Sequence, residues 1–487
     1  MLKPEYLQSV PDNMIKLFAQ AEADILADMA RRISEYDYWI PAVEHQAKML
    51  EEAGMVREEI LARLNRLTGK TTKELTELMV EAGTVALKSD DEVYQRSGLD
   101  PPPISSSGDL QAVLQAGYEK TAGQFLNLTK TTANTATFQF ERALDRAYMQ
   151  ITMGGFDYNT AIRNTIKDLS KDGVGAIRYP SGKVDSIEVA VRRAVITGVN
   201  QTSLRLQDTR ADEMGSDLVE VNAHSGARPE HAVWQGGIYS RSGKSTKYPG
   251  LVETTGYGTG AGLGGWNCSH SYRPWFEGMP RTYSEDMLEE YNAKNIEYNG
   301  KKLTEYEALQ EQRYIERNIR RWKREESAMS AAGLDASEAT SKVREWNRKH
   351  KAFLEQTGLK ADGTRVIVGV HSAQRQKEIA IRAELKELGF RGKMNIIPKQ
   401  INVDMLGFDD KHINGEREHN VTADEAKGFV RNAKISMTVW NGKFERYYSE
   451  DGASYVDTTS HQIRTAFKKD QYDEKTRKLL EVLKKYE

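Results

Sequence analysis

Four side chains in the middle of the chain have the chemistry of metal ligands. Imidazole nitrogens and a thiolate are donors that zinc prefers, and four of them complete a tetrahedral shell. The four are His224, His231, Cys268 and His270. Their spacing differs from that of zinc fingers, because the two first histidines are seven positions apart and no Cys-x-x-Cys pair occurs. The residues fit either a structural zinc site or hydrogen-bonded loop positions.

The loop itself supports the second interpretation equally well. Glycines crowd residues 226–265, too many for regular helices or strands. A glycine-rich loop needs polar and aromatic side chains that hold its backbone, and Arg228, Gln235 and Trp266 could do this without a metal. Both interpretations therefore stay open at this point.

A second group of titratable side chains lies near the C-terminus, within the segment DDKHINGEREHN (residues 409–420). Cleavage of RNA without a metal needs a base for the 2′-hydroxyl proton, an acid for the leaving oxygen and a cation for the phosphorane charge. The segment supplies such groups at neutral pH, namely His412, Glu416, Arg417 and His419. The alternative is a solvated polar turn. From residue 360 onward 24 Lys and Arg exceed 20 Asp and Glu, which mildly favours a polyanionic partner.

Apolar residues recur every three or four positions through most of the chain, which predicts α-helices. These helices must position both groups of titratable side chains. We expect a multidomain protein with mainly α-helical N-terminal and central parts, a Gly-rich α+β Cys/His module and a small C-terminal α+β domain with an antiparallel meander. The regions are helical residues 1–97, a Pro-rich linker 98–108, helical residues 109–215, the Cys/His module 216–280, a helical hairpin 281–365 and the α+β domain 366–487.

Local signals predict several element boundaries. Thr72 is expected to cap a new helix, and the pairs Thr304/Glu307 and Thr422/Glu425 have the capping-box pattern. Gly358 is expected to end a helix in the left-handed conformation. Strands are expected at 364–370 and in four runs separated by turn signals, 434–440, 443–449, 453–457 and 462–467.

Composition excludes some classes of protein. The 487 residues carry a net charge of −2, so no case for nucleic-acid binding rests on the whole chain. One cysteine excludes an internal disulfide framework and fits a reducing cytoplasm. No apolar segment reaches the ~18 residues of a membrane-spanning helix, and the N-terminus lacks a secretion signal. We therefore expect no membrane span.

The middle region resembles the phage minor capsid protein 2 family and, more loosely, the phage Mu F-like head morphogenesis proteins. The resemblance rests on HSGARPEHAVWQGGIYS and on YPGLVETTGYGTGAGLGGWNCSHSYRPWFEG, and it extends over roughly residues 1–365. Two positions depart from the pattern, since Gly264 stands where relatives often have a cysteine and Ser269 where an arginine is common. The resemblance implies a virion component made in the host cytoplasm, located at the portal vertex or head interior, whose partners are the portal and major capsid proteins.

The order of elements after residue 366 resembles the barnase, EndoU, colicin and RelE-like ribonuclease fold of phage proteins. This resemblance implies an RNA substrate, no cofactor for the cleavage and an immunity protein as a further partner. It implies that His412 is the leading acid or base, assisted by Arg417 or His419. It further implies phosphate contacts from the last strand, by Arg464 and Thr465, with Tyr455 nearby. The alternatives are a purely structural virion protein whose C-terminal domain is a binding module, or a zinc-binding interaction protein.

Overall fold

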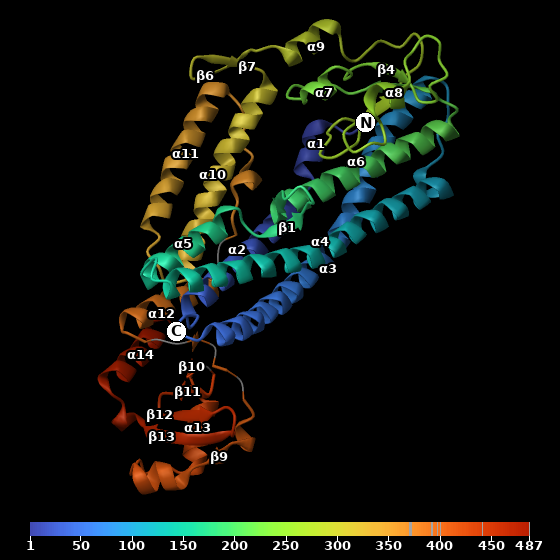
Figure 1. The fold of residues 1–487 in the computed structure, drawn as a ribbon. Coiled ribbons are helices and arrows are strands. Elements are labelled where there is room, and N and C mark those ends of the chain that lie inside the picture. Colours follow the sequence, from blue (N-terminus) through green and yellow to red (C-terminus); the bar gives the residue numbers. More distant parts are fainter. Residues whose placement is uncertain (370–372, 391–392, 397, 400, 441, 487) are drawn as a thin grey trace. The chain divides into compact units, whose positions relative to one another are not determined.

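The computed structural model describes residues 1–369, 373–390, 393–396, 398–399, 401–440 and 442–486. Helices account for most of this chain, and several small sheets lie between and after them (Figure 1). The chain forms two compact units. The first comprises Met1–Met29, Tyr38–Ala328 and Ala336–Val370; the second comprises Ala30–Asp37, Met329–Asp335 and His371–Glu487. Among the described residues, no helix is both long and apolar enough to cross a membrane.

Long helices build the first unit. They are α1 (Pro4–Ser9), α2 (Asp12–Glu35), α3 (Ala42–Arg96), α4 (Gly108–Thr152), α5 (Tyr158–Lys171) and α6 (Ile187–Glu213). Helix α3 packs along α4, and α6 contacts both. A two-stranded hairpin, β1 (Gly175–Arg178) with β2 (Val184–Ser186), joins α5 to α6. The buried residues of these helices recur every three or four positions, as the periodicity predicts.

Helix α3 is continuous for 55 residues, so the prediction that Thr72 begins a new helix is wrong. The Thr72 hydroxyl lies inside the helix and donates to the carbonyl of Thr68 at 2.6 Å. A threonine can satisfy its hydroxyl in this way, one turn back, without ending a helix. The proline segment that follows leads through a short 3₁₀ turn, Ile104–Ser106, to Ser107, whose hydroxyl caps α4. It therefore connects two helices of the same unit.

The Cys/His region contains short elements around a small antiparallel sheet. In chain order they are β3 (Leu218–Val221), α7 (Pro229–Ala232), β4 (Ile238–Ser240), α8 (Leu251–Thr255) and β5 (Tyr272–Pro274). The strand order is β4-β3-β5. Its core contains Leu204 of α6 together with Val221, Trp234, Leu263 and Cys268. Helix α6 therefore packs against the glycine-rich loop and supports it.

A helical pair follows the Cys/His region. After α9 (Glu285–Asn292) and the hairpin β6 (Ile296–Tyr298) with β7 (Lys301–Leu303) come α10 (Glu305–Ala331) and α11 (Ser337–Thr357). The predicted capping box is confirmed, because the Thr304 hydroxyl accepts from the Glu307 amide at 3.2 Å and the Glu307 carboxylate accepts from the Thr304 amide at 2.9 Å. Gly358 ends α11 with φ of 69°, also as predicted.

The prediction of a strand at 364–370 is wrong for the residues of this run that the structure describes. Gly363–Val366 forms a 3₁₀ turn, and no strand occurs through residue 369, while residue 370 lies outside the described residues. The turn is held by Asp362, whose carboxylate accepts from the amide of Thr364 at 3.0 Å. Arg192 of α6 also donates to the Thr364 hydroxyl at 3.0 Å. These contacts of polar side chains override the β propensity of the apolar run.

The C-terminal part of the second unit is a six-stranded sheet of order β8-β10-β11-β12-β13-β9. Its elements are α12 (Ala373–Glu387), β8 (Lys393–Asn395), β9 (Gly407–Phe408), the π-helical turn η4 (Lys411–Glu416), α13 (Ala423–Arg431), β10 (Ile435–Val439), β11 (Phe444–Tyr448), β12 (Gly452–Asp457), β13 (Gln462–Lys468) and α14 (Glu474–Lys485). Strands β10 to β13 pair in succession and antiparallel, and β9 pairs parallel with β13. Thr422 and Glu425 form the predicted capping box at the start of α13.

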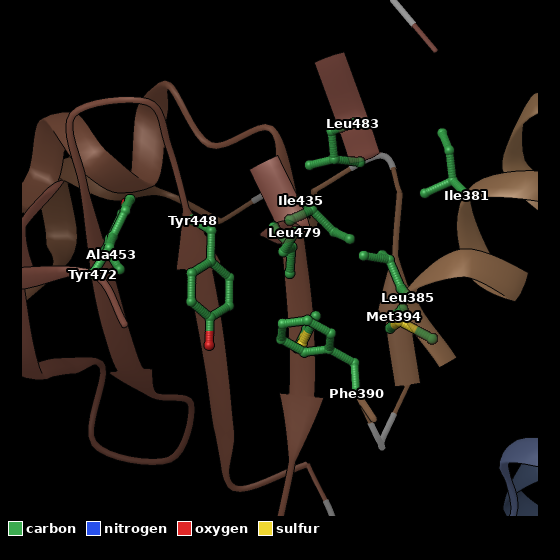
Figure 2. Close-up of a cluster of buried hydrophobic side chains, with 11 residues drawn as sticks. Ile381, Leu385, Phe390, Met394, Ile435, Tyr448, Ala453, Tyr472, Leu479 and Leu483 are labelled. Carbon is green, nitrogen blue, oxygen red and sulfur yellow. The ribbon is translucent and has the colours of Figure 1, made fainter. Parts of the chain in front are cut away.

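Helices cover both faces of this sheet. Figure 2 shows one cluster, in which Leu385 of α12 and Leu479 and Leu483 of α14 pack with Ile435 and Tyr448 of the strands. On the other face, α13 contributes Phe429 and Val430 to a cluster with Tyr447, Val456 and Ile463. Successive strand residues point to opposite faces, so Tyr447 and Tyr448 enter different cores.

Candidate metal centre and candidate ribonuclease site

Three of the four predicted zinc ligands lie together in the first unit. His231 belongs to the short helix α7, whereas Cys268 and His270 lie in the loop that leads into β5. All three side chains are buried, with exposed fractions of 1 to 2%. The Nδ1 atoms of His231 and His270 are 3.4 Å apart, and Cys268 Sγ lies 3.7 Å from the first and 3.6 Å from the second. The structure thus brings three of the four candidate ligands together.

The three distances match the edges of a zinc tetrahedron. With zinc–sulfur bonds of about 2.3 Å and zinc–nitrogen bonds of about 2.05 Å, tetrahedral angles place two nitrogens about 3.35 Å apart and sulfur about 3.55 Å from each nitrogen. The observed separations lie within about 0.2 Å of these values. One Cys and two His are also a donor set that zinc uses in proteins. The residues therefore fit this ion.

Hydrogen bonds at the far side of each ring fix both imidazole tautomers. His231 Nε2 donates to the carbonyl of Ala261 at 2.8 Å, and His270 Nε2 donates to Gln235 Oε1 at 3.1 Å. The backbone amide of His224 donates to the same Gln235 oxygen at 3.1 Å. This second donor defines how the side-chain amide of Gln235 is oriented. Metal-bound histidines commonly hold their second nitrogen in this way.

These tautomers direct lone pairs towards one point. Because both Nε2 atoms carry the proton, the Nδ1 atoms of His231 and His270 present lone pairs to each other at 3.4 Å. The thiol of Cys268 can donate its single proton to only one of them. Burial lowers the pKa of both histidines, so neither is favoured as an imidazolium that could bridge the gap. A cation between the three atoms satisfies all of them.

His224, the fourth predicted ligand, is placed differently. Its ring packs on that of His270, with centroids 4.5 Å apart, and its Nδ1 lies 2.8 Å from the carbonyl of Ser225. Its Nε2 is buried and has no hydrogen-bond partner within the described part of the chain. Among the residues that the structure describes, the ligand atoms within mutual reach belong to His231, Cys268 and His270. His224 therefore adjoins the cluster through its ring.

Neighbouring helix α6 and close backbone packing hold the Cys-x-His segment in place. Asn200 donates to the carbonyls of Cys268 and His270 at 2.9 and 3.0 Å. A Cβ atom at Gly262 would lie only 2.1 Å from the carbonyl oxygen of Gly256, so no larger residue fits there. Asn200 is not among the residues expected from the sequence, because an asparagine within a helical stretch carries no local signal of this role.

The C-terminal candidate residues form two sets. In the first, His412 Nδ1 lies 2.7 Å from Glu416 Oε2, one turn along η4. Asp409 joins this turn to β13, because one of its oxygens accepts from the His412 amide at 3.2 Å and the other pairs with Arg464 at 2.7 Å. His412 and Arg464 are partly exposed, at 29% and 49% of their side-chain surfaces. Asp409 thus contacts both the backbone of His412 and the side chain of Arg464, whereas the imidazole of His412 contacts Glu416.

The second set lies around Phe467. Its ring is 5.7 Å from His419 and 5.6 Å from Tyr455, and Gln471 holds His419 Nδ1 at 3.0 Å. Thr465 of β13 is the cross-strand partner of Tyr455. Within the described ranges, no hydrogen bond or ring contact joins the two sets. Arg417 is exposed, and over the same ranges it makes no ion pair with a residue of either set.

Known proteins match part of the chain. Residues 2–355 match the family described as phage minor capsid protein 2. A structural protein of Lactococcus phage LL-H is 22% identical over 330 residues, covering 64% of this chain and 85% of that protein. A structural protein of Lactococcus phage mv4 is 32% identical over 112 residues, covering 23% of this chain and 82% of that protein. No solved structure matches the chain.

Proposed function

This chain belongs to the phage minor capsid protein 2 family, and we propose that it acts at the portal vertex or in the head interior, where it contacts the portal and major capsid proteins. Membership makes it a structural component of a phage virion, in agreement with the two phage structural proteins to which it is similar. The finer location follows from what the family implies. Cross-linking of purified heads, followed by identification of linked peptides, should join this chain to the portal protein; exclusive links to tail proteins would contradict the location.

A zinc ion is the proposed structural element of the Cys/His module. The observation that supports it is the tetrahedral spacing of the three buried donors, His231, Cys268 and His270. Zinc would supply a cross-link between α7 and the loop before β5, which lie almost forty residues apart along the chain. The residues themselves exclude water and orient the ligand nitrogens through Ala261 and Gln235. The role is structural, since the cluster is buried.

Metal content of the full chain tests this proposal. Protein made in zinc-supplied cells should hold close to one zinc per chain, and Cys268→Ser and His270→Gln should lose it. His461→Gln is the matched control, since His461 is an exposed histidine of a turn. Cobalt loading gives a second readout, because a thiolate ligand produces sulfur-to-metal absorption that Cys268→Ser should abolish. Zinc absent from the wild type, or retained by both variants, would overturn the proposal.

His224→Gln separates three protein ligands from four. If His224 stays in its contact with Ser225, this variant should keep its zinc and lose only the packing of one ring on His270. Loss of zinc as complete as in His270→Gln would make His224 the fourth ligand instead.

A metal-independent ribonuclease in the C-terminal part is the second proposed function. The observation that favours it is the His412–Glu416 pair beside Arg464, with Asp409 between them. Glu416 orients the imidazole, and Arg464 would neutralise the phosphorane charge once a phosphate displaces Asp409. His419, Tyr455 and Thr465 would contact the RNA, with Arg417 as an exposed cation. An immunity protein would be required in the producing cell.

Cleavage of single-stranded RNA by the full chain in the presence of a chelator tests this function. His412→Ala should lower the rate by about 10²–10⁴-fold, the usual contribution of a general acid or base, while His461→Ala should leave it unchanged. RNA that stays intact, or equal rates for the two variants, would leave the C-terminal part as a binding module.

A further inference from the structure

A cavity of about 530 Å³ in the first unit has five cations among its sixteen lining residues. One wall is helix α10, which contributes Arg317, Arg320, Arg321 and Arg324. These positions are three or four residues apart, so they follow one face of the helix. The opposite wall is formed by the end of α5 and by the β1–β2 hairpin, and it adds Lys171.

Carboxylates within the cavity do not balance this charge. The lining residues include five cations and two carboxylates, Asp172 and Asp185, which gives an excess of 5 − 2 = 3 positive charges. Asp185 is already engaged, because it forms ion pairs with Arg193 and, at 3.4 Å, with Lys183. Glu188 and Glu22, outside the lining, balance Arg320 and Arg324, so the positive charge that the cavity presents belongs to Lys171, Arg317 and Arg321.

Two of the arginines are fixed by the fold and are paired with carboxylates outside the lining. Arg324 donates to the carbonyls of Ser170 and Lys171 at 3.2 and 3.1 Å, at the end of α5, and lies 3.8 Å from Glu22. Arg320 pairs with Glu188 at 2.5 Å. Each of these residues has one carboxylate partner and is mostly buried, so neither can swing out into solvent.

The remaining arginines have unused donors. Arg317 and Arg321 make no ion pair with any described residue. The Nε atoms of Arg320 and Arg321 are buried and, over the described ranges, have no hydrogen-bond acceptor. These Nε atoms are not accessible from the cavity, so an oxyanion that enters it meets the terminal guanidinium nitrogens of Arg317 and Arg321.

The geometry points to a binding site for a phosphate group in this cavity, with Arg317 and Arg321 as its principal ligands and Arg320 as support. A phosphate carries up to two charges and offers oxygens in several directions, which suits three guanidinium groups better than a planar carboxylate of one charge. The volume lies within the range of small-molecule pockets, so it admits a phosphate-bearing molecule of nucleotide size. The phosphate could belong to a free anion or to a nucleic-acid backbone.

Titration calorimetry of the full chain distinguishes these sources. One arm uses pyrophosphate and the other a single-stranded oligonucleotide, each at low salt. Arg317→Gln/Arg321→Gln should weaken binding of the true ligand at least tenfold. Arg344→Gln/Arg348→Gln removes the same charge from two exposed residues of α11 and should change affinity less than twofold.

The results decide between the alternatives. Binding of pyrophosphate alone assigns the site to a free anion, whereas tighter, salt-dependent binding of the oligonucleotide assigns it to a nucleic-acid backbone. Equal affinities of the two double variants for both probes would overturn the proposal. So would binding of an acidic peptide as tight as that of the phosphate probes, because the site would then recognise carboxylates.

Discussion

The side-chain amide of Asn200 donates to the backbone carbonyls of Cys268 and His270, at 2.9 and 3.0 Å. One buried residue of α6 thus holds both ends of the Cys-x-His segment. The two carbonyls turn towards the helix, and the side chains of Cys268 and His270 are left to meet His231 on the other side. The candidate metal centre therefore depends on contacts that Asn200 makes with residues 68 and 70 positions further along the chain.

Replacement of Asn200 by aspartate should therefore disturb the module. Aspartate has the same shape but only acceptor atoms, so it faces two carbonyl oxygens that lose their donor. We expect the free energy of unfolding to fall by about 2 kcal/mol, within the range for buried unsatisfied polar groups. Asn299→Asp makes the same change of charge at an exposed turn and should have little effect. Denaturant unfolding in excess zinc measures both, and equal losses would refute the role of Asn200.

Gln235 should control the affinity for zinc without being a ligand. Its Oε1 accepts from His270 Nε2 and from the amide of His224. Gln235→Met keeps the volume but removes this acceptor, and we expect zinc affinity to fall 10- to 100-fold, as for other partners of metal-bound histidines. Gln201→Met is the control, because Gln201 donates to Gly264 in the same loop and contacts no ligand. Competition with a chromogenic chelator gives the affinities. A loss in the control as large as in Gln235→Met would indicate general loosening of the loop.

Stability should fall with rising pH because of Glu316 on α10. Burial raises the pKa of Glu316 to about 7, and the nearby Asp362 also raises it. Arg365 and the hydrogen bond that Gln312 donates to Glu316 Oε1 act in the opposite direction. The folded state binds the proton more tightly than the unfolded chain, so the stabilisation is complete below the ordinary glutamate pKa and is lost as pH rises through 7. Between pH 5 and 8 the loss should be on the order of 2 kcal/mol.

Glu316→Gln should flatten this dependence, because glutamine does not ionise. Thermal unfolding at both pH values measures the difference. His350 Nε2 lies 3.7 Å from Glu316 Oε1, and burial lowers the pKa of this histidine, so His350→Gln serves as the companion variant. A lowered histidine pKa makes stability rise with pH, so His350→Gln should keep or steepen the fall. A fall that persists unchanged in Glu316→Gln would refute the role of the glutamate.

Two glycine substitutions should have opposite effects. Gly262→Ala places a Cβ atom 2.1 Å from the Gly256 carbonyl, which forces the loop apart and should lower both stability and zinc content. Gly54 lies on the exposed side of α3 with no atom within 4 Å of a Cβ, so Gly54→Ala should raise the free energy of unfolding by about 0.5–1 kcal/mol. Unfolding curves of both variants check the signs. A stable, zinc-loaded Gly262→Ala protein would show that the loop can adopt another packing.

Features that depend on residues close together in the chain were predictable from the sequence. The capping boxes at Thr304 and Thr422 and the left-handed Gly358 involve partners within a few positions, and the structure has all three. The periodicity of the long helices belongs to the same class. The predictions at Thr72 and at residues 364–370 were wrong because each local pattern is compatible with two structures. Packing and side-chain contacts with other parts of the chain decide which one forms.

The sequence by itself determined that His224, His231, Cys268 and His270 share one module, since they belong to one family signature. Only the tertiary structure decided that three of them converge while His224 packs ring against ring. It also decided that Asn200 holds the loop and that arginines of α10 meet the β1–β2 hairpin. The physical reason is the same in each case. A helix or a cap is determined by groups one turn away along the chain. A ligand cluster or a cavity depends instead on the packing of elements that are far apart in the sequence.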